Sequence, residues 1–600
     1  MVDSPDADVK LILRSSSLVV TLAVVAAAVQ LLYIFESHRH LVFQVPLVDA
    51  AAYHNQAMAL AMGQTPAPRA FWQPPLYPYA LSVPYRMEIT DLRTVRCLHA
   101  LLGIAAALLI FAVGRRCGGV RVGFLAGLGL CCYGPLLFFF SQLLPTGLAV
   151  TLNLAAILLL LRLTEKPTWP RALALGLTVG LATLTVPNSA VMILIALGWI
   201  AVQTGHLTRQ DPNQNRDVLR LALALVAGLI IVIAPVTIRN YSVSGEFVPI
   251  STNGGINLYI GNNPHPEETL TIRPGLDWER LVAMPYRLGA KTDTEAERFF
   301  VNKVVTFAWK SPLEYIRGLL EKTQEAFTSR EIPRNEDINV FAGHSAVLRA
   351  LVWRIGSFAF PFGLIGPLAI VGALTLTRRH RARSLVLLFA LGYMASVILF
   401  FPASRYLAPV IPAFVIFAVL GIKRLIELPT LPLLSRLASV GLLAVSGVLI
   451  NLPRQLPTDR VNYEAEMHTN VGVGLQTRSR MEESIMEYRE AIRLDPASAD
   501  AHRYLGTAYR ASGQSALAMQ EFERAVALRP DHDAAIQDLA IIRYEQGHVE
   551  EAVELLRKVI ALNPENRQAM TNLGVGLLRL NRRAEATQWF KKAGVASPSR

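Results

Sequence analysis

The sequence predicts an all-α protein in two parts, a polytopic membrane domain followed by an α-solenoid of helical repeats. Hydrophobic residues make up 52% of the 600-residue chain and charged residues only 17%, against about 25% charged residues in soluble proteins. The apolar residues gather in blocks long enough to cross a hydrocarbon core of about 30 Å. Residues beyond about 460 are instead polar and periodic, which indicates a second domain of another kind.

Eleven apolar blocks are predicted as membrane spans. Basic residues lie in short loops between them, such as Arg115, Arg116 and the stretch TRRHRARS at 377–384. Because short cytoplasmic loops are rich in Lys and Arg, this placement predicts a cytoplasmic N-terminus and an external C-terminal domain. The first block continues apolar to Phe35, so we interpret it as an uncleaved anchor rather than a signal peptide. The predicted spans are 17–35, 93–113, 121–140, 145–163, 171–187, 188–204, 219–239, 355–377, 384–401, 406–424 and 435–451.

The distribution of charge argues against nucleic-acid binding, and the positions of the cysteines and histidines argue against disulfides and metal sites. The net charge of +13 does not predict nucleic-acid binding, because no basic patch is interleaved with aromatic residues. The four cysteines lie in or beside apolar blocks and match neither a disulfide framework nor a zinc site. His38 and His40 have no further ligand set around them, so no metal site is predicted there.

The C-terminal part repeats with a period of 34 residues, the signature of tetratricopeptide repeats. The small residues let paired helices approach closely, and each proline ends the second helix of a pair. Four repeats should stack into a short superhelix with a concave face. The periodic positions are Pro496, Pro530, Pro564 and Pro598, then Gly472, Gly506, Ala540 and Gly574, then Ser484, Ala518, Ala552 and Ala586. The predicted domains are 1–455 in the membrane, with outer loops 36–92 and 240–350, a linker at 456–463, and repeats at 464–600.

Asp49 has two possible interpretations from the residues alone. The stretch DAAAYHNQAMALAMG reads as a helix with Asp49 at its N-cap and Gly63 at its end. On that interpretation it simply caps an amphipathic helix at the membrane surface. The same carboxylate follows the first span on the predicted outer side, where long loops commonly carry function. The following stretch FWQPPLYPYALSVPYR, at 71–86, fits an aromatic belt.

These motifs, taken in order, resemble the dolichyl- or polyprenyl-phosphate-sugar transferases of the protein-mannosyltransferase type, which have the GT-C fold. The resemblance covers roughly 15–455 and includes Asp-x3-Tyr at Asp49 and Tyr53, then QPPLYPYAL. Further matching stretches are IRNYSVSGEFVPISTNGGINLYIGNNP at 238–264, EIPRN at 331–335 and SRYLAPVIPAF at 404–414. The resemblance implies a lipid-phosphate-linked sugar as donor substrate, with Asp49 as general base.

An arginine at the outer end of a span is costly to place there and therefore suggests a function. Arg405 is the first candidate to bind the donor phosphate and Arg239 the second, since the planar guanidinium suits phosphate. Six further residues are candidates for the substrate pocket: Tyr53, Gln73, Tyr77, Gln142, Glu331 and Tyr406. Gln142 stands where relatives often have an acidic residue, so a metal held by two carboxylates is unsupported, and no cofactor is assigned.

Three functions remain open from the sequence. The first is a sugar transferase in a bacterial inner membrane, with periplasmic repeats that dock the acceptor, a protein or a glycan, or a separate partner. The second is an O-antigen-ligase-like transferase of preassembled oligosaccharides, which would not need Asp49. The third is a membrane-anchored repeat scaffold without enzymatic activity, although one span would suffice as its anchor.

Overall fold

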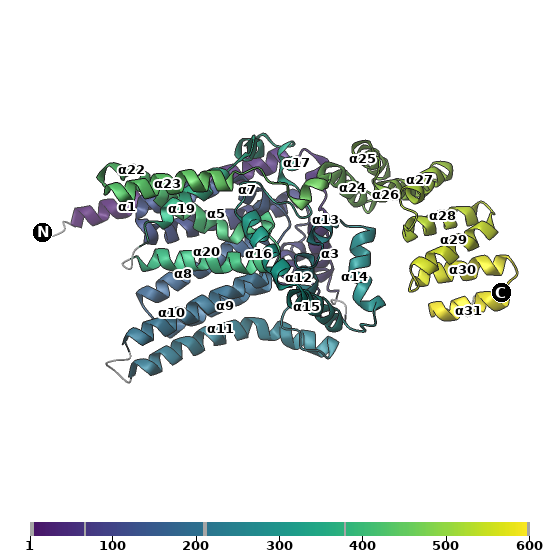
Figure 1. Ribbon diagram of the computed structural model, residues 1–600, viewed down its shortest axis with the longest axis horizontal. Helices are drawn as coiled ribbons and strands as arrows, with labels where there is room; N and C mark the ends of the chain where they lie inside the picture. The colour runs from purple at the N-terminus through teal and green to yellow at the C-terminus, as the bar shows by residue number, and fades with distance from the viewer. Residues whose placement is uncertain (1–4, 65–67, 208–212, 377–379, 597–600) are drawn as a thin grey trace. The chain divides into compact units, whose positions relative to one another are not determined.

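The computed structural model describes residues 5–64, 68–207, 213–376 and 380–596, and Figure 1 shows the order of its elements. The chain divides into two compact units. The first, the membrane unit, consists of Met1–Gln44, Asp49–Thr271 and Ala283–Arg460. The second, the repeat unit, consists of Val45–Val48, Ile272–Val282 and Val461–Arg600. The repeat unit thus includes eleven residues that the sequence assigned to the outer loop 240–350. Positions 377–379 of the predicted basic loop lie outside the described residues.

Among the described residues, seven helices are long and apolar enough to cross a membrane. Their apolar blocks are those predicted, and most of them run roughly parallel in Figure 1. The chain is therefore a multi-pass membrane protein. The seven spans are Ser16–Ser37 in α1 (Pro5–Ser37), α5 (Leu92–Gly118), α8 (Thr146–Glu165), Arg216–Ser244 in α11 (Asn213–Ser244), α20 (Arg381–Phe400), Ser404–Ile426 and α23 (Leu433–Ile450). The sixth of these comprises α21 (Ser404–Leu407), the 3-10 helix η2 (Ala408–Val410) and α22 (Ile411–Ile426).

The other four predicted spans are bent or short, so eleven full-length spans are not shown. Helices α6 (Val120–Cys131) and α7 (Gly134–Ser141) meet at a bend of 63° and form an eighth span if counted together. Helices α9 (Trp169–Thr185) and α10 (Val191–Leu207) have 17 residues each and flank the 3-10 helix η1 (Pro187–Ala190). The predicted start of the eighth block at 355 is wrong. There β1 (Trp353–Ile355) and β2 (Phe358–Phe360) pair antiparallel, and α19 (Phe362–Ala373) follows.

Glycines allow two pairs of membrane helices to reach backbone contact. A Cβ atom on Gly176 of α9 would lie 2.0 Å from the carbonyl oxygen of Leu225 in α11. A Cβ atom on Gly372 of α19 would lie 1.8 Å from the carbonyl oxygen of Phe417 in α22. No side chain fits at either point, so these small residues fix the packing of the bundle, as is common in membrane helices.

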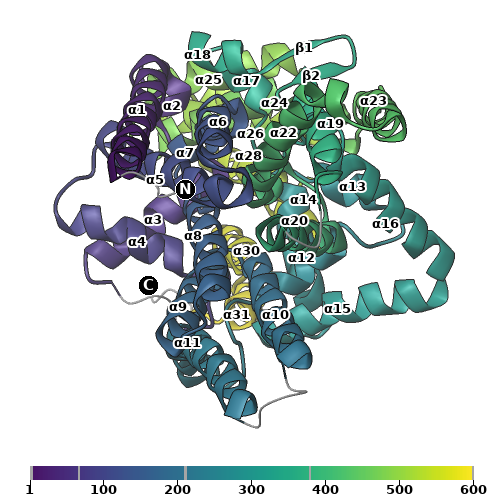
Figure 2. The ribbon, with the colours of Figure 1, turned by 90° about the vertical axis from the view of Figure 1, so that its left-hand side faces the viewer.

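The longer segments that connect the membrane helices gather at one end of the bundle in Figure 1, and Figure 2 views the bundle along its helices. Asn240 joins two of them, since it accepts a hydrogen bond from the Phe71 amide at 3.2 Å and donates to the carbonyl oxygens of Val248 and Ile250. The elements are α2 (Leu41–Gln44), α3 (Val48–Ala61), α4 (Leu76–Arg86), α12 (Gly254–Ile260), α13 (Pro266–Thr271), α14 (Leu276–Arg287), α15 (Asp293–Lys310), α16 (Pro312–Ala326), α17 (Ile338–Ala342) and α18 (Ala346–Leu351). Short 3-10 helices η3 (Leu428–Thr430) and η4 (Pro457–Arg460) flank α23.

The repeat unit consists of paired helices, as the period of 34 predicts. Within each pair, a small residue on the first helix faces a large one on the second, 16 positions later. A Cβ atom on Gly506 would lie 2.7 Å from the ring of Phe522, for example. The helices are α24 (Tyr463–Gln476), α25 (Met481–Leu494), α26 (Ala499–Ala511), α27 (Ser515–Leu528), α28 (Asp533–Glu545), α29 (Val549–Leu562), α30 (Arg567–Arg579) and α31 (Arg583–Ala593).

Candidate active site

Asp49 lies in the first turn of α3, on the wall of a cavity of the membrane unit. Its carboxylate Oδ2 accepts hydrogen bonds from Asn335 Nδ2 at 2.8 Å and from Arg405 Nη1 at 2.5 Å. The predicted N-cap role is therefore not what the structure shows, since α3 begins at Val48 and both described bonds of Asp49 go to side chains. The side chain of Asp49 is 24% exposed, so it remains open to a ligand.

Helix α3 is held in place by aromatic packing on its buried face. Ala50, Tyr53 and Ala57 face a core that also contains Tyr77 and Leu81 of α4. The rings of Tyr53 and Tyr77 meet edge to face with their centroids 5.3 Å apart. Such a pair contributes about 0.5–1.5 kcal/mol beyond the area it buries. This packing fixes the turn that carries Asp49.

Arg405 reaches Asp49 from the start of the span Ser404–Ile426. Its Nη2 donates to the hydroxyl of Tyr406 at 2.7 Å, and its side chain is 17% exposed. The preceding residue is clamped to the loop 328–337, because Ser404 Oγ accepts from the Ile332 amide at 2.8 Å and the Ser404 amide donates to the Ile332 carbonyl at 3.0 Å. This clamp brings the stretches EIPRN and SRYLAP together and places Asn335 and Arg405 on the same carboxylate.

The loop 328–337 adds two further carboxyl groups beside the pair. Glu331 and Glu336 line a small cavity of about 30 Å³ together with Asp49, Asn335 and Arg405. Burial raises the pKa of both glutamates to about 7, and the nearby negative charge of Asp49 adds to this effect at Glu336. Glu336 Oε2 has no hydrogen-bond partner among the described residues. A group that titrates near neutral pH therefore lies beside the Asp49–Arg405 pair.

A larger cavity of about 370 Å³ opens on the other side of Asp49 and Arg405. Its wall combines apolar and aromatic side chains with amide and hydroxyl groups, the mixture that holds and orients a small polar ligand. Among the described residues that line it, Arg405 is the one cation. The lining includes Asp49, Tyr53, Gln73, Pro74, Thr146, Thr185, Asn188, Ser251, Asn253, Asn257, Glu297, Val397, Phe400, Arg405 and Tyr406.

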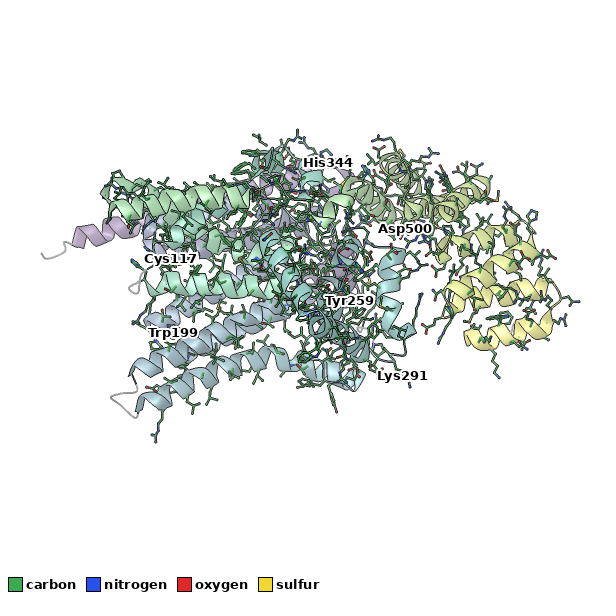
Figure 3. The ribbon with its side chains drawn as sticks, viewed as in Figure 1. Cys117, Trp199, Tyr259, Lys291, His344 and Asp500 are labelled. Atoms are coloured by element: carbon green, nitrogen blue, oxygen red, sulfur yellow. The ribbon has the colours of Figure 1, made fainter. Side chains whose placement is uncertain are left out.

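The glycine-rich stretch NGGINLYIGNN forms one side of this cavity through α12. A Cβ atom on Gly255 would lie 2.4 Å from the carbonyl oxygen of Glu297 in α15, so this glycine permits the close approach of the two helices. Tyr259, which Figure 3 labels, packs on Phe300 with ring centroids 5.3 Å apart. This packing turns Asn253 and Asn257 to the cavity. Burial raises the pKa of Glu297 on the same wall.

Comparison with known families adds an independent finding. Residues 72–238 match the family model described as dolichyl-phosphate-mannose-protein mannosyltransferase. Residues 478–513 and 509–570 match two models of tetratricopeptide repeats. The chain contains a mannosyltransferase-type membrane domain and tetratricopeptide repeats. The match to the mannosyltransferase family includes Gln73 and part of the cavity wall, whereas Asp49 and Arg405 lie outside the matched range.

No protein with a curated description matches the chain. Solved structures that align with part of it include MamA, with 26% identity over 22% of this chain and 75% of that chain, at a TM-score of 0.21. Another is pilF of Pseudomonas aeruginosa, with 28% identity over 22% of this chain and 60% of that chain, also at a TM-score of 0.21.

The larger cavity of the membrane unit brings together five of the residues predicted from the sequence: Asp49, Tyr53, Gln73, Arg405 and Tyr406 all line it. Glu331 lies in the adjoining small cavity. The other three predicted residues have different surroundings. Tyr77 packs behind Tyr53, and its hydroxyl lies 3.3 Å from His99. Gln142 is buried, and its backbone carbonyl oxygen lies 3.2 Å from Nδ1 of His99. Arg239 stacks on Phe71 with its guanidinium carbon 4.0 Å from the ring centre.

Several polar residues of the two cavities were not predicted. Asn335 was within the quoted stretch EIPRN and Glu336 directly follows it, so that motif could have indicated both. Asn253 and Asn257 were likewise within a stretch that carried the family resemblance. Asn188 and Glu297 had no such signal, because only the folded chain brings α15 and η1 to the same wall.

One group of possible metal ligands lies elsewhere in the membrane unit. His265, Glu267 and Glu268 place ligand atoms within 4.8 Å of one another at the start of α13. Exposed acidic groups of this kind are common without a metal, and this group does not line the cavity of Asp49 among the described residues. We therefore assign no metal ligands to the cavity of Asp49.

Proposed function

We propose that the protein is a membrane glycosyltransferase that moves a sugar from a polyprenyl-phosphate-linked donor to an acceptor hydroxyl at the periplasmic face of a bacterial inner membrane. The observation that carries the proposal is the meeting of Asp49 with Arg405. These residues are 356 positions apart in the chain, yet they pair at 2.5 Å on the wall of one cavity. The match to the mannosyltransferase family supports the donor class.

Asp49 is assigned as the general base. Both described hydrogen bonds of its carboxylate end on Oδ2, so Oδ1 is the oxygen that we assign to accept a proton. The acceptor oxygen forms a bond to the anomeric carbon of the sugar, and the bond from that carbon to the phosphate oxygen breaks. The proton of the acceptor hydroxyl passes to Asp49, and the polyprenyl phosphate leaves. A positioned base of this kind typically contributes about 10²–10⁴ in rate.

Arg405 is assigned to the phosphate of the donor. Its guanidinium has five N–H donors, of which Asp49 and Tyr406 use one each in the described contacts. The remaining donors can bind a phosphate that gains negative charge as the sugar departs. Stabilisation of that charge by a cation within a cavity accelerates the reaction because the charge develops in the transition state.

The orientation in the membrane rests on the distribution of basic residues. The positive-inside rule places the loops that carry Asp49 and Asn335 outside, with the repeats on the same side. We assign the repeats to docking of an acceptor or a partner protein, since stacked helical repeats form extended binding surfaces.

The test is the Asp49→Asn variant of the full chain in detergent, with release of sugar from a polyprenyl-phosphate donor as the measurement. We expect the rate to fall by about 10²–10⁴. Asp91→Asn is the matched control, because Asp91 belongs to the same outer loop but caps α5 through the Thr94 amide at 2.9 Å. Near wild-type transfer by a folded Asp49→Asn protein would contradict the assignment. That result would favour an O-antigen-ligase-like reaction, whereas inactivity of the wild type with a broad donor panel would favour a scaffold.

A further inference from the structure

An eleven-residue segment of the long outer loop belongs to the repeat unit. Residues Ile272–Val282, with the sequence IRPGLDWERLV, cluster with Val461–Arg600 rather than with the loop residues on either side. The segment begins without regular secondary structure, turns at Pro274 and Gly275, and enters α14 at Leu276. Leu276 and Leu281 are each only 4% exposed, so the segment buries apolar side chains as well as its charged contacts.

The segment contacts the repeats through paired opposite charges. Arg280 Nη1 donates to Asp531 Oδ2 at 2.5 Å, and Arg280 Nη2 donates to the carbonyl oxygen of the same residue at 2.6 Å. In the opposite sense, Arg529 of the repeats forms an ion pair with Asp277 of the segment. Arg529 and Asp531 are two positions apart, so the single loop between α27 and α28 contacts both charged residues of the segment.

Two more contacts lie nearer the start of the segment. The guanidinium carbon of Arg273 lies 5.0 Å from the ring centre of Tyr463 in α24, and Glu466 is a nearby negative charge. Gly275 has a φ of +130°, and a Cβ atom there would lie 2.8 Å from the carboxylate of Asp500. Asp500, labelled in Figure 3, is at the start of α26. Only glycine combines this backbone form with such a close approach.

The contacts follow the N-terminal ends of α24, α26 and α28, the first helices of three successive repeats. A short segment that presents arginine, glycine, a carboxylate and arginine in order along stacked repeats has the properties of a bound peptide. The ion pairs are partly exposed, with Arg280 at 28% and Asp531 at 49%, and each such pair contributes only about 0.2–1 kcal/mol. The segment is held mainly because it is covalently tethered, which gives it a high effective concentration.

We propose that Ile272–Val282 is an intramolecular ligand of the repeat unit, and that a partner peptide of the same chemistry binds there by displacing it. The partner presents arginine to Asp531 and a carboxylate to Arg529. This inference rests on the proposed docking function of the repeats and names its partner class. It does not depend on the chemistry at Asp49.

The experiment uses the full chain in detergent and a fluorescent synthetic peptide with the sequence of residues 272–282. In the Asp277→Ala/Arg280→Ala variant, the tethered segment loses both charged contacts while the site on the repeats stays intact. We expect this variant to bind the peptide at least about tenfold more tightly than the wild type, because the tethered competitor is weakened. Equal affinity for the two proteins would overturn the proposal.

Two controls identify the site. A peptide in which alanine replaces the second arginine should bind the variant at least about tenfold more weakly, since it cannot pair with Asp531. Adding Asp531→Asn to the variant should cause a similar loss, and binding that ignores this change would also overturn the proposal. Asp49→Asn in the same background should bind the peptide unchanged. Failure of the transferase assignment and failure of this inference are therefore measured separately.

Discussion

The repeat unit and the cavity of Asp49 are built from contacts of very different range along the chain. In the repeats, the small residues at 472, 506, 540 and 574 each precede their large partner by 16 positions. In the cavity, Asp49 bonds to Asn335 across 286 positions and to Arg405 across 356. The first kind of contact recurs with the period of the sequence, whereas the second exists only once.

The difference determines how each region tolerates change. In the repeats, the small residue and its large partner change together. Gly472, Gly506 and Gly574 each face an aromatic ring, whereas Ala540 shares a core with the smaller Leu556. The cavity has no second copy of its contact, so loss of one partner has no substitute there. We therefore expect graded losses of stability in the repeats and large losses of activity at the cavity.

The largest effect after that of Asp49 is expected at Arg405. Arg405→Ala should lower sugar transfer by about 10²–10³, the usual loss when a donor to developing negative charge is removed. Arg405→Lys should recover only part of it, because lysine keeps the charge but not the planar fork. The measurement is the rate of release from a polyprenyl-phosphate donor at saturating concentration.

Arg239→Ala tests the second predicted phosphate ligand in the same assay. Its guanidinium stacks on Phe71 and donates to the carbonyl oxygen of Arg69 at 2.8 Å. We expect the rate of transfer to fall by less than about tenfold. A loss of this size fits a residue that positions the loop around it and does not itself stabilise the charge on the phosphate. If Arg239→Ala were as damaging as Arg405→Ala, the phosphate site would have to include both arginines.

The same difference in range explains what the sequence could predict. The repeat helices follow from the period of 34, and the apolar blocks identify the membrane helices, because both signals are local. Asp49, Arg405 and Tyr53 were found through motifs of the family resemblance. Asn188 and Glu297 were missed because nothing in the chain near them reveals a shared cavity. The strands at 353–360 were missed because an apolar run before α19 does not distinguish a strand from the first turn of a helix.

A medium effect is expected from exchanging a glycine of the repeats. In Gly506→Ala the new methyl group would lie 2.7 Å from Phe522, which is fully buried. Overpacking of this kind costs about 1–3 kcal/mol. Hydrogen exchange in α26 and α27 of the full chain should therefore become faster.

The third repeat supplies the compensating change. Adding Phe522→Leu to Gly506→Ala recreates the alanine and leucine found at 540 and 556, and it should restore most of the lost protection. If the double variant exchanged as fast as Gly506→Ala alone, the pairing of small with large residues would not be what sets the helix spacing.

A pH dependence should separate Glu336 from Glu325. Burial raises the pKa of each side chain to about 7, above the usual value of 4.5. Between these two values the folded protein binds more protons than the unfolded chain, so each group lowers stability as pH rises through that window. Replacing either one by glutamine should flatten this decline in the thermal unfolding midpoint measured in detergent.

Of these two glutamates, only Glu336 should also affect the rate of sugar transfer. As pH rises through about 7, its new negative charge lies beside Asp49 and Arg405, with Arg96 as the other nearby cation. An ionised Glu336 competes for Arg405 and repels the donor phosphate, so wild-type transfer should fall by up to about tenfold per pH unit above this point. Glu336→Gln should remove that fall. Glu325 lines a neighbouring small cavity whose lining does not include Asp49, Arg405 or Glu336, so Glu325→Gln should keep the alkaline fall. A decline that persisted in Glu336→Gln would show that another group near Asp49 titrates there, with Glu331 as the first candidate.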